Sequence, residues 1–263
     1  MVSIDLARQP GRTVNRPVHL PVTHGFVHSL ETAGAVDGPG IRYVLFVSGC
    51  PLRCQYCHNP DTWHRKHGKE TTAAEVLADL GSYASFLKRA RGGLTISGGE
   101  PLTQVPFIAE VFAGAKALGL HTALDTSGFL GRNLPDAVLA DIDLVLLDIK
   151  AFSEATYHAV TGAELQPTLD FAQRLARLGK PVWLRYVLVP GLTDKADEID
   201  GLAAYAKALG NVSRVDVLPF HKMGEFKWAD CGRPYQLGDT EPPTPALVEA
   251  TRGRFRAAGL NAP

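Results

Sequence analysis

Three cysteines that lie close together are the residues of this sequence best suited to chemistry. Cys50, Cys54 and Cys57 have the spacing C-x3-C-x2-C, and the remaining cysteine, Cys231, lies far from them. Thiolates bind soft metals such as zinc, copper(I) and iron–sulfur clusters. A disulfide-stabilised secreted protein would instead spread its cysteines through a short chain. We therefore expect a metal site at residues 50–57 in a reducing compartment, and a free thiol at Cys231.

The spacing leaves two kinds of metal site open. A structural zinc site needs four protein ligands, and His58 is available as the fourth. A 4Fe–4S cluster can be held by three thiolates, which leaves one iron open for a substrate or cofactor. The cysteines alone favour neither alternative.

Other polar residues fall at the expected ends of strands. Apolar and β-branched runs, each followed by a helical pattern, predict six strands, near residues 42, 94, 122, 145, 184 and 216. Strands that alternate with helices are parallel, so their carboxyl ends meet at one edge, where ligands bind in such folds. The polar residues expected at that edge are Ser97, Gly98, Gly99, Glu100, Asp125, Thr126, Asp148, Lys150, Arg185 and His221.

The alternation of strands and helices predicts an α/β fold. Strand-then-helix units joined by right-handed crossovers form a parallel sheet, and six units are too few for the closed eight-unit barrel. We expect a partial (β/α)6 TIM-like barrel, with a doubly wound sheet as the alternative. A further short strand is expected at residues 25–30. Helices are expected at about 71–89, 104–118, 135–140, 153–160, 168–178, 194–209 and 244–258.

The pattern indicates one core domain with an extension. Residues 1–21 contain Arg8, Arg12 and Arg16 among prolines and polar residues and lack the apolar segment of a secretory signal. We expect them to form a flexible N-terminal extension. Residues 22–263 show no internal repeat, low-complexity segment or linker, so we expect them to form a single domain.

Composition and charge exclude several classes of protein. The 263 residues are 45% apolar, enough for a large core, and 27 Lys and Arg residues balance 27 Asp and Glu residues. A general nucleic-acid binder would carry a basic excess. No apolar run approaches the ~20 residues that a membrane-spanning helix needs. We therefore expect a cytoplasmic protein that binds neither nucleic acid nor membrane.

The cysteine motif resembles that of a known enzyme family. C-x3-C-x2-C with an aromatic residue before the last cysteine, here Tyr56, is similar to the signature of the radical S-adenosylmethionine (SAM) enzymes. The resemblance implies that Cys50, Cys54 and Cys57 bind a 4Fe–4S cluster whose fourth iron binds the amino and carboxylate groups of SAM. It also implies a partial (β/α)6 barrel, in agreement with the six units above.

Longer motifs resemble one branch of this family, the activating enzymes of glycyl-radical enzymes. The motifs concerned are residues 36–42, 56–63, 124–129, 185–191 and 218–228. The last two narrow the resemblance to members that act on pyruvate formate-lyase. No cysteine lies between Cys57 and Gly98, so the additional cysteine-rich domain of many other activators is absent. The resemblance runs from about residue 25 to the end of the chain.

The resemblance implies an activity and partners. A reduced flavodoxin or ferredoxin would give one electron to the cluster, and SAM would be cleaved to methionine and a 5′-deoxyadenosyl radical. That radical would remove a hydrogen from a backbone glycine of formate acetyltransferase (pyruvate formate-lyase). We expect the protein to act as a monomer. Two alternatives stay open: a radical enzyme acting on another glycyl-radical partner or a small molecule, and a zinc-binding α/β module without catalysis.

The resemblance also assigns roles to single residues. The expected catalytic residues are Cys50, Cys54, Cys57, Lys150 and Asp37, the last near the glycine loop of the partner. The residues expected to contact the cofactor are Tyr56, Cys57, His58, Gly98, Gly99, Glu100, Asp148, Ile149, Lys150, Arg185 and His221. A monovalent cation is expected between Asp125, Thr126, the carbonyl of Leu146 and Asp148.

Within the cofactor set, the resemblance distinguishes three regions of SAM. The motif ending in Glu100 is expected to meet the methionine amino group, for which a carboxylate is a suitable partner. Asp148 and Lys150 are expected beside the ribose and the carboxylate, because a carboxylate that leaves water needs a charged partner, and Arg185 is expected to share that task. His221 is expected near the adenine.

Overall fold

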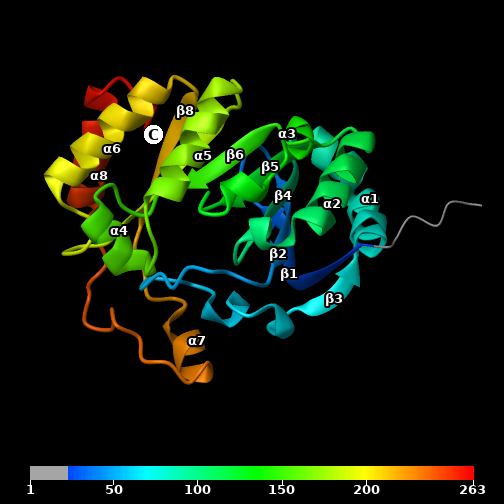
Figure 1. Ribbon diagram of the computed structural model, residues 1–263, viewed down its shortest axis with the longest axis horizontal. Coiled ribbons are helices and arrows are strands. Elements are labelled where there is room, and N and C mark those ends of the chain that lie inside the picture. The colour runs from blue at the N-terminus through cyan, green and yellow to red at the C-terminus, as the bar shows by residue number, and fades with distance from the viewer. Residues whose placement is uncertain (1–22) are drawn as a thin grey trace, which may run out of the picture.

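An eight-stranded sheet organises the fold (Figure 1). The computed structural model describes residues 23–263, so the extension predicted at residues 1–21 lies outside the described residues. The strands are β1 (His24–Gly34), β2 (Arg42–Val47), β3 (Lys69–Thr72), β4 (Gly93–Gly98), β5 (His121–Thr126), β6 (Leu144–Asp148), β7 (Val182–Leu188) and β8 (Val212–Pro219). Their order across the sheet is β3-β1-β2-β4-β5-β6-β7-β8.

The strands from β2 to β8, apart from β3, form the parallel part of the sheet. They lie side by side in the order of the sequence, and each neighbouring pair is parallel. A doubly wound sheet reverses its strand order at a switch point, and no reversal occurs in this part of the chain. Successive right-handed crossovers in one direction place the helices on one face. The predicted partial (β/α)6 barrel is confirmed, and the doubly wound alternative is wrong.

Two antiparallel strands extend the sheet at one end. β1 pairs with β2, and β3 pairs with the first residues of β1. The strand predicted at residues 25–30 is therefore confirmed as part of β1. β3 was not predicted, because its four residues are polar and none is fully buried, which leaves no apolar period to detect.

Apart from α7 (Glu225–Asp230), which lies away from the sheet at the bottom of the view, the helices follow the outside of the curved sheet (Figure 1). The helices are α1 (Ala73–Arg89), α2 (Val105–Ala117), α3 (Asp136–Ala140), α4 (Glu154–Thr161), α5 (Gln166–Arg177), α6 (Ala196–Leu209), α7 (Glu225–Asp230) and α8 (Pro245–Ala257). All the predicted helices are confirmed to within a few residues. α7 was not predicted, because its six residues are too few to show a helical period. Among residues 23–263, no helix combines the length and apolarity needed to cross a membrane.

The first long helix begins as its sequence predicts. Thr72 and Glu75 form a capping box: the Thr72 hydroxyl accepts from the Glu75 N–H at 3.1 Å, and the Glu75 carboxylate accepts from the Thr72 N–H at 2.7 Å. These bonds satisfy N–H groups that have no partner within the helix. Val76, Leu80 and Leu87 then face the core, so α1 is fixed at its start and along one side.

A buried arginine closes the end of the barrel opposite the carboxyl ends of the strands. Arg42, at the start of β2, is completely buried, and its Nε donates to Thr95 Oγ1 at 2.9 Å. Its guanidinium also donates to the carbonyls of Pro39 (3.2 Å) and Leu94. Thr95 Oγ1 in turn donates to the Asp37 carbonyl at 2.6 Å. This network fixes the turn between β1 and β2 inside the barrel, where Asp37 reaches the cavity described next.

Candidate active site

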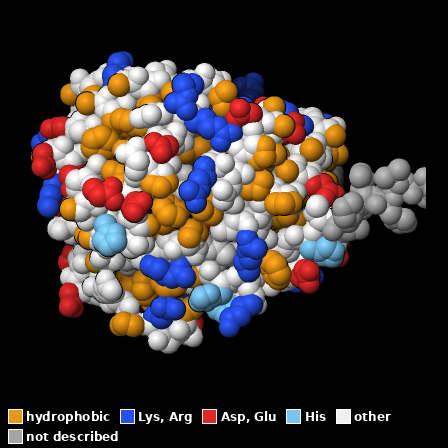
Figure 2. Space-filling model, in the orientation of Figure 1, with side chains coloured by type: hydrophobic (Ala, Val, Ile, Leu, Met, Phe, Trp, Pro, Cys, Tyr) orange, Lys and Arg blue, Asp and Glu red, His pale blue; other side chains and the backbone are white. Residues whose placement is uncertain are grey.

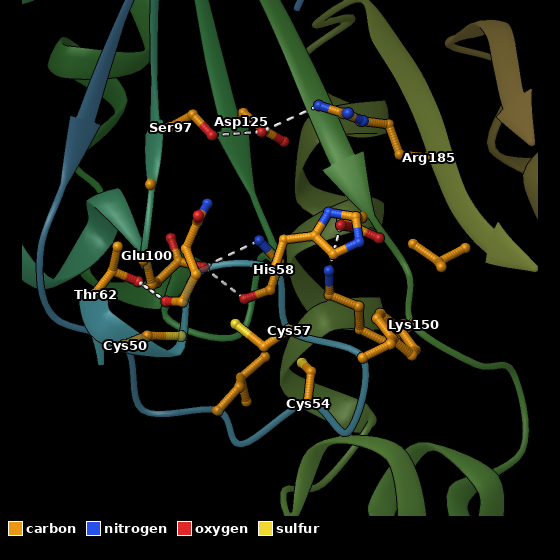
Figure 3. A pocket seen from close by; sticks show the side chains of 18 of the residues that line it. Cys50, Cys54, Cys57, His58, Thr62, Ser97, Glu100, Asp125, Lys150 and Arg185 are labelled. Atoms are coloured by element: carbon orange, nitrogen blue, oxygen red, sulfur yellow. Dashed lines mark hydrogen bonds and ion pairs between the residues drawn. The ribbon is translucent and has the colours of Figure 1, made fainter. Parts of the chain in front are cut away.

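A cavity of about 490 Å³ lies at the carboxyl ends of the parallel strands. Its volume is suited to a small ligand or cofactor. Figure 3 shows side chains from the cysteine loop (residues 50–57) and from the strand ends pointing toward one another across it. The predicted residues that line it are Asp37, Cys50, Cys54, Tyr56, Cys57, His58, Gly98, Gly99, Glu100, Asp125, Thr126, Asp148, Lys150, Arg185 and His221.

Two predicted residues do not line the cavity. The Leu146 side chain packs with Ala123 and Leu144 in a small apolar cluster, and Ile149 is buried in the main core. Any contact of Leu146 or Ile149 with a cation or cofactor would therefore be made by backbone atoms, and both remain predictions. Cys231, which follows α7, is a free thiol that does not line the cavity.

Backbone hydrogen bonds from two other segments fix the cysteine loop. The Cys50 N–H donates to the Trp63 carbonyl at 3.1 Å, just after the loop. The Arg53 N–H donates to the carbonyl of Thr161, the last residue of α4, at 2.8 Å. The loop backbone thus has its own partners, and the three thiols stay free to bind a metal.

Burial keeps these thiols protonated when no metal is bound. Burial raises the pKa of Cys50, and the neighbouring Cys54 adds to the rise. Burial also raises the pKa of Cys54 to about 12. It raises the pKa of Cys57 as well, although hydrogen bonds from the Asn59 backbone and the Trp63 side chain oppose the shift. Such thiols become thiolates when a metal cation replaces the proton.

Two glycines allow β4 to approach the cysteine loop closely. Gly98 has φ +119°, and a Cβ at this position would lie 2.2 Å from the backbone nitrogen of Val47. A Cβ at Gly99 would lie 2.6 Å from the carbonyl oxygen of Gly49 and 3.3 Å from Cys50 Cβ. Only residues without a side chain fit here, so the end of β4 lies directly against the start of the loop.

Glu100 follows these glycines and is fully engaged by the protein. Its carboxylate accepts from Thr126 Oγ1 (2.6 Å), from the N–H and hydroxyl of Ser127 (3.0 and 2.5 Å), and from the Leu102 N–H (3.2 Å). Burial raises its pKa, and the bonds from Ser127 and Thr126 oppose that rise. Glu100 therefore holds the ends of β4 and β5 together. Its predicted contact with the methionine amino group remains a prediction.

A buried ion pair lies at the end of β6. Lys150 Nζ donates to Asp148 Oδ2, and both side chains are about five-sixths buried, with 15% and 16% exposed. Burial lowers the pKa of Lys150, but the negative charge of Asp148 and its hydrogen bond to the ammonium outweigh burial and raise that pKa above its ordinary value. The ammonium also lies 5.8 Å from the centre of the Tyr56 ring. A permanent positive charge thus stands beside the cysteine loop.

A second buried ion pair joins β5 and β7. Arg185 Nη1 lies 3.1 Å from Asp125 Oδ2, which also accepts from the Ser97 hydroxyl at 2.7 Å. The charge of Asp125 raises the pKa of Arg185, against the effect of burial. Burial raises the pKa of Asp37 across the cavity, and the charge of Arg185 opposes that rise. The cavity therefore contains both carboxylates and cations, which suits a zwitterionic ligand.

Two histidines stack at the wall of the cavity. The rings of His58 and His221 have centroids 4.0 Å apart, and His58 Nε2 lies 3.3 Å from the His221 carbonyl oxygen. A Cβ at Gly224 would lie 2.6 Å from the His58 carbonyl oxygen. The segment after β8 therefore packs closely against the cysteine loop and fixes the position of both rings.

Three buried polar atoms at this cavity have no partner within residues 23–263. They are Asp148 Oδ1, His221 Nδ1 and the Tyr56 hydroxyl. A buried polar atom without a hydrogen bond costs free energy, about 1–3 kcal/mol. Unpaired groups gathered at one cavity indicate a ligand that supplies the missing partners.

Comparison with known proteins gives the family. Residues 44–203 match the model of the Radical SAM superfamily. The chain is 47% identical to the pyruvate formate-lyase-activating enzyme of Streptococcus mutans serotype c over 232 residues, which cover 85% of this chain and 88% of that protein. It is 40% identical over 237 residues to the pyruvate formate-lyase 1-activating enzyme of Escherichia coli K12, covering 89% and 96% of the two chains. The chain belongs to the radical SAM superfamily and, within it, to the pyruvate formate-lyase-activating enzymes.

Solved radical SAM structures share the fold. A radical SAM methyltransferase from Sphaerobacter thermophilus superposes with a TM-score of 0.61 at 17% identity, covering 93% of this chain and 78% of that one. A domain of a pyruvate-formate lyase-activating enzyme from Bacteroides vulgatus gives a TM-score of 0.55 at 21% identity, covering 65% and 98%. At these identities the similarity concerns the fold alone.

Membership of the radical SAM superfamily implies a 4Fe–4S cluster and SAM, and the cavity fits both. Three free thiols suit the cluster, and the charges of both signs and the unpaired atoms suit an amino-acid-bearing nucleoside such as SAM. Among residues 23–263, no three His, Cys, Asp or Glu side chains lie close enough to share a single metal ion. A cluster instead distributes its thiolates over several irons.

Residues with no expected role also contact the cysteine loop. Trp228 Nε1 on α7 donates to the Cys57 carbonyl at 2.9 Å, and Lys227 Nζ donates to Asn59 Oδ1 at 2.8 Å. Trp63 lies edge-on to Trp228, with ring centroids 5.2 Å apart. The family motifs contained all three residues, but only the fold shows that α7 holds the loop. Ser127, the main partner of Glu100, lies in the motif at residues 124–129, but no role was expected for it.

Proposed function

We propose that this protein activates formate acetyltransferase (pyruvate formate-lyase) by placing a radical on one of its glycines. The observation that carries the proposal is the convergence of three free thiols with two buried ion pairs in one cavity. The chain that contains this cavity is 47% identical to a pyruvate formate-lyase-activating enzyme. When bound, the cluster and SAM supply an electron and a 5′-deoxyadenosyl radical, which takes a hydrogen atom from the glycine.

The cysteine loop would hold the cluster. Cys50, Cys54 and Cys57 are its thiolate ligands in this proposal, and burial around them excludes water. Tyr56 and His58 line the space beside the last ligand. Low-potential clusters are tuned by hydrogen bonds and burial around their sulfurs, so the Trp63 side chain, which lines the cavity with Cys57, belongs to the same environment.

The strand ends would hold SAM. Lys150 and Arg185 offer positive charge to its carboxylate, and Asp148 Oδ1 is free to accept a hydrogen bond from the ribose. His221 Nδ1, also without a partner, would face the adenine. The backbone at Gly98, Gly99 and Ile149 is the remaining expected contact. Together these side-chain and backbone groups would orient the cofactor and keep water away from it.

We also propose a monovalent cation beside the SAM carboxylate. Asp125, Thr126 and Asp148 line the cavity, and Leu146 lies on β6 with Asp148, where it pairs with Asp125 of β5. Oxygen ligands of this kind suit a hard cation. The free Asp148 Oδ1 supports the proposal, whereas Asp125 Oδ2 already binds Arg185 and Ser97 and must be shared.

Asp37 would meet the partner's glycine segment. Its side chain lines the cavity, and its carbonyl is held by Thr95. The glycine must leave its own fold to reach this cavity, so the partner opens a loop on binding. We further propose that the protein works in the cytoplasm as a monomer and takes its electron from a reduced flavodoxin or ferredoxin.

Anaerobic activation tests the proposed function. The protein is reconstituted with iron and sulfide, mixed with SAM, photoreduced deazaflavin and candidate formate acetyltransferase, and examined by electron paramagnetic resonance (EPR). We expect a glycyl-radical signal and one 5′-deoxyadenosine per radical. Cleavage of SAM without a radical on this partner would favour another glycyl-radical enzyme or a small molecule. A colourless protein that binds zinc and leaves SAM intact would favour the non-catalytic alternative.

A further inference from the structure

Exposed cations without carboxylate partners gather on the outside of the cysteine loop. They are Arg53, Arg65, Lys66 and Arg233, and we call them the basic face. None of the four forms an ion pair with any residue of 23–263. Figure 2 shows Lys, Arg and His side chains over the lower part of the molecule, where Figure 1 places this loop and α7.

Acidic residues of the segment 53–67 do not pair with the basic face. The one carboxylate in the segment 53–67, Asp61, is taken by His28 at 2.8 Å and by Lys227 at 3.4 Å. His64, which is exposed between these cations, has a pKa lowered by desolvation and then by positive charges alone. Since the whole chain has no net charge, this face is a local concentration of positive potential, which attracts an oppositely charged partner.

The basic face touches the residues that hold the cluster. Arg53 Nη1 donates to the Cys50 carbonyl at 2.7 Å and to the Leu52 carbonyl at 2.8 Å. The Arg65 side chain lies against the backbone at Gly49, where a Cβ would approach it to 2.8 Å. Two of the four cations are therefore in direct contact with the start of the cysteine loop.

A tryptophan connects the basic face with a cluster ligand. The guanidinium groups of Arg53 and Arg233 lie 4.8 and 5.0 Å from the Trp63 ring centre. Trp63 lines the cavity together with Cys57. A protein bound to these arginines would be separated from the cluster by little more than one aromatic ring and the cysteine loop itself.

We infer that the basic face is the docking surface of an acidic, one-electron protein donor. The inference rests on the proposed function, which requires an electron from outside. The donor loses one electron and the cluster gains one, so no bond forms or breaks at the surface. Arg53, Arg65, Lys66 and Arg233 do not line the cavity. The donor and the glycine-bearing partner would therefore approach different faces.

Charge reversal on the basic face tests the inference. Lys66→Glu with Arg233→Glu leaves the cysteines and the cavity unchanged. The matched control is Arg89→Glu with Arg177→Glu, which changes the net charge equally at the far ends of α1 and α5, where both arginines are exposed. Each reconstituted holoenzyme receives SAM and formate acetyltransferase, with either reduced flavodoxin or photoreduced deazaflavin as reductant.

We expect a loss that depends on the reductant. With flavodoxin at low salt, the rate of 5′-deoxyadenosine formation in the basic-face variant falls about tenfold or more, and its dependence on salt weakens, because steering by charge is lost. With deazaflavin the variant matches the wild type, and the control matches it with both reductants. An unchanged rate with flavodoxin, or an equal loss with both reductants, would overturn the inference. Failure of the wild type with deazaflavin would instead count against the proposed function.

Discussion

Arg42 and Arg185 are both buried inside the barrel, at opposite ends and with opposite kinds of partner. Arg42 donates to the Thr95 hydroxyl and to the carbonyls of Pro39, Leu94 and His121, and burial lowers its pKa to about 10. Arg185 instead faces the carboxylate of Asp125, which raises its pKa. Arg42 lies at the start of β2, at the end of the barrel away from the cavity, whereas Arg185 lines the cavity.

The different partners of the two arginines indicate that one end of the barrel contributes mainly to stability and the other mainly to function. Around Arg42 the hydrogen bonds are made within the protein, so that end is complete without a ligand. Around Arg185 the neighbouring Asp148, His221 and Tyr56 each keep a buried atom without a partner. Substitutions at the closed end should therefore change the free energy of unfolding, and substitutions at the open end should change cofactor binding and radical formation.

The largest expected effect comes from Cys54→Ala at the open end. Removal of one of three thiolates prevents stable cluster binding, so the glycyl-radical EPR signal should disappear. The metal-free variant should still unfold cooperatively, because the loop backbone keeps its own hydrogen bonds. Cys231→Ala, outside the cavity, is the matched control and should retain the full signal. A radical from the Cys54 variant would contradict the ligand assignment.

The next largest effect is expected from Arg42→Met at the closed end. The variant leaves the carbonyls of Pro39 and Leu94 and the Thr95 hydroxyl without their donor, and should lower the free energy of unfolding by about 3 kcal/mol. Urea denaturation of the metal-free protein measures it. Arg185→Met should shift the midpoint less. Equal shifts of the urea midpoint in the Arg42 and Arg185 variants would show that the two ends of the barrel contribute equally to stability.

A smaller effect, on binding, is expected from Lys150→Met. Asp148 then keeps a buried negative charge without a counterion, and the SAM carboxylate loses its cation, so the Kd for SAM should rise about 30-fold, or ~2 kcal/mol. Equilibrium dialysis with the reconstituted protein measures this. Lys116→Met removes a lysine whose pair with Asp143 is one-third exposed, and it should leave the Kd unchanged. A normal Kd in the Lys150 variant would mean that other groups bind the carboxylate.

The smallest effect is expected from Trp228→Phe on α7. The change removes the hydrogen bond from Trp228 Nε1 to the Cys57 carbonyl and should cost about 1 kcal/mol of stability. It should also alter the EPR spectrum of the reduced cluster, because the loop around Cys57 loosens. Trp183→Phe, outside the cavity, is the control and should leave that spectrum unchanged. Identical spectra for all three proteins would show that α7 does not position the ligand.

Much of the fold was predictable because its strands and helices bury regular apolar patterns. Val76, Leu80 and Leu87 on α1 recur at helical spacing, and their burial is what makes α1 a helix of this fold. β3 and α7 were missed because they are short and are held by contacts with distant segments. No local pattern records such contacts.

The candidate site was predictable as a set of residues but not as a set of bonds. Parallel strands bring their carboxyl ends together, so Asp125, Asp148 and Arg185 could be placed at one edge. The saturation of Glu100 by Thr126 and Ser127 could not be read from the sequence. That pairing depends on side-chain directions at the ends of two different strands.

The bond from Trp228 to Cys57 also sets an order of events during synthesis. The two residues lie 171 positions apart, and all three cysteines leave the ribosome long before α7 does. A nascent chain that ends before residue 228 thus displays its thiols on a loop that lacks one of its supports. That bond can form only after α7 has been made, whereas the bonds from the loop to the Trp63 and Thr161 carbonyls can form earlier.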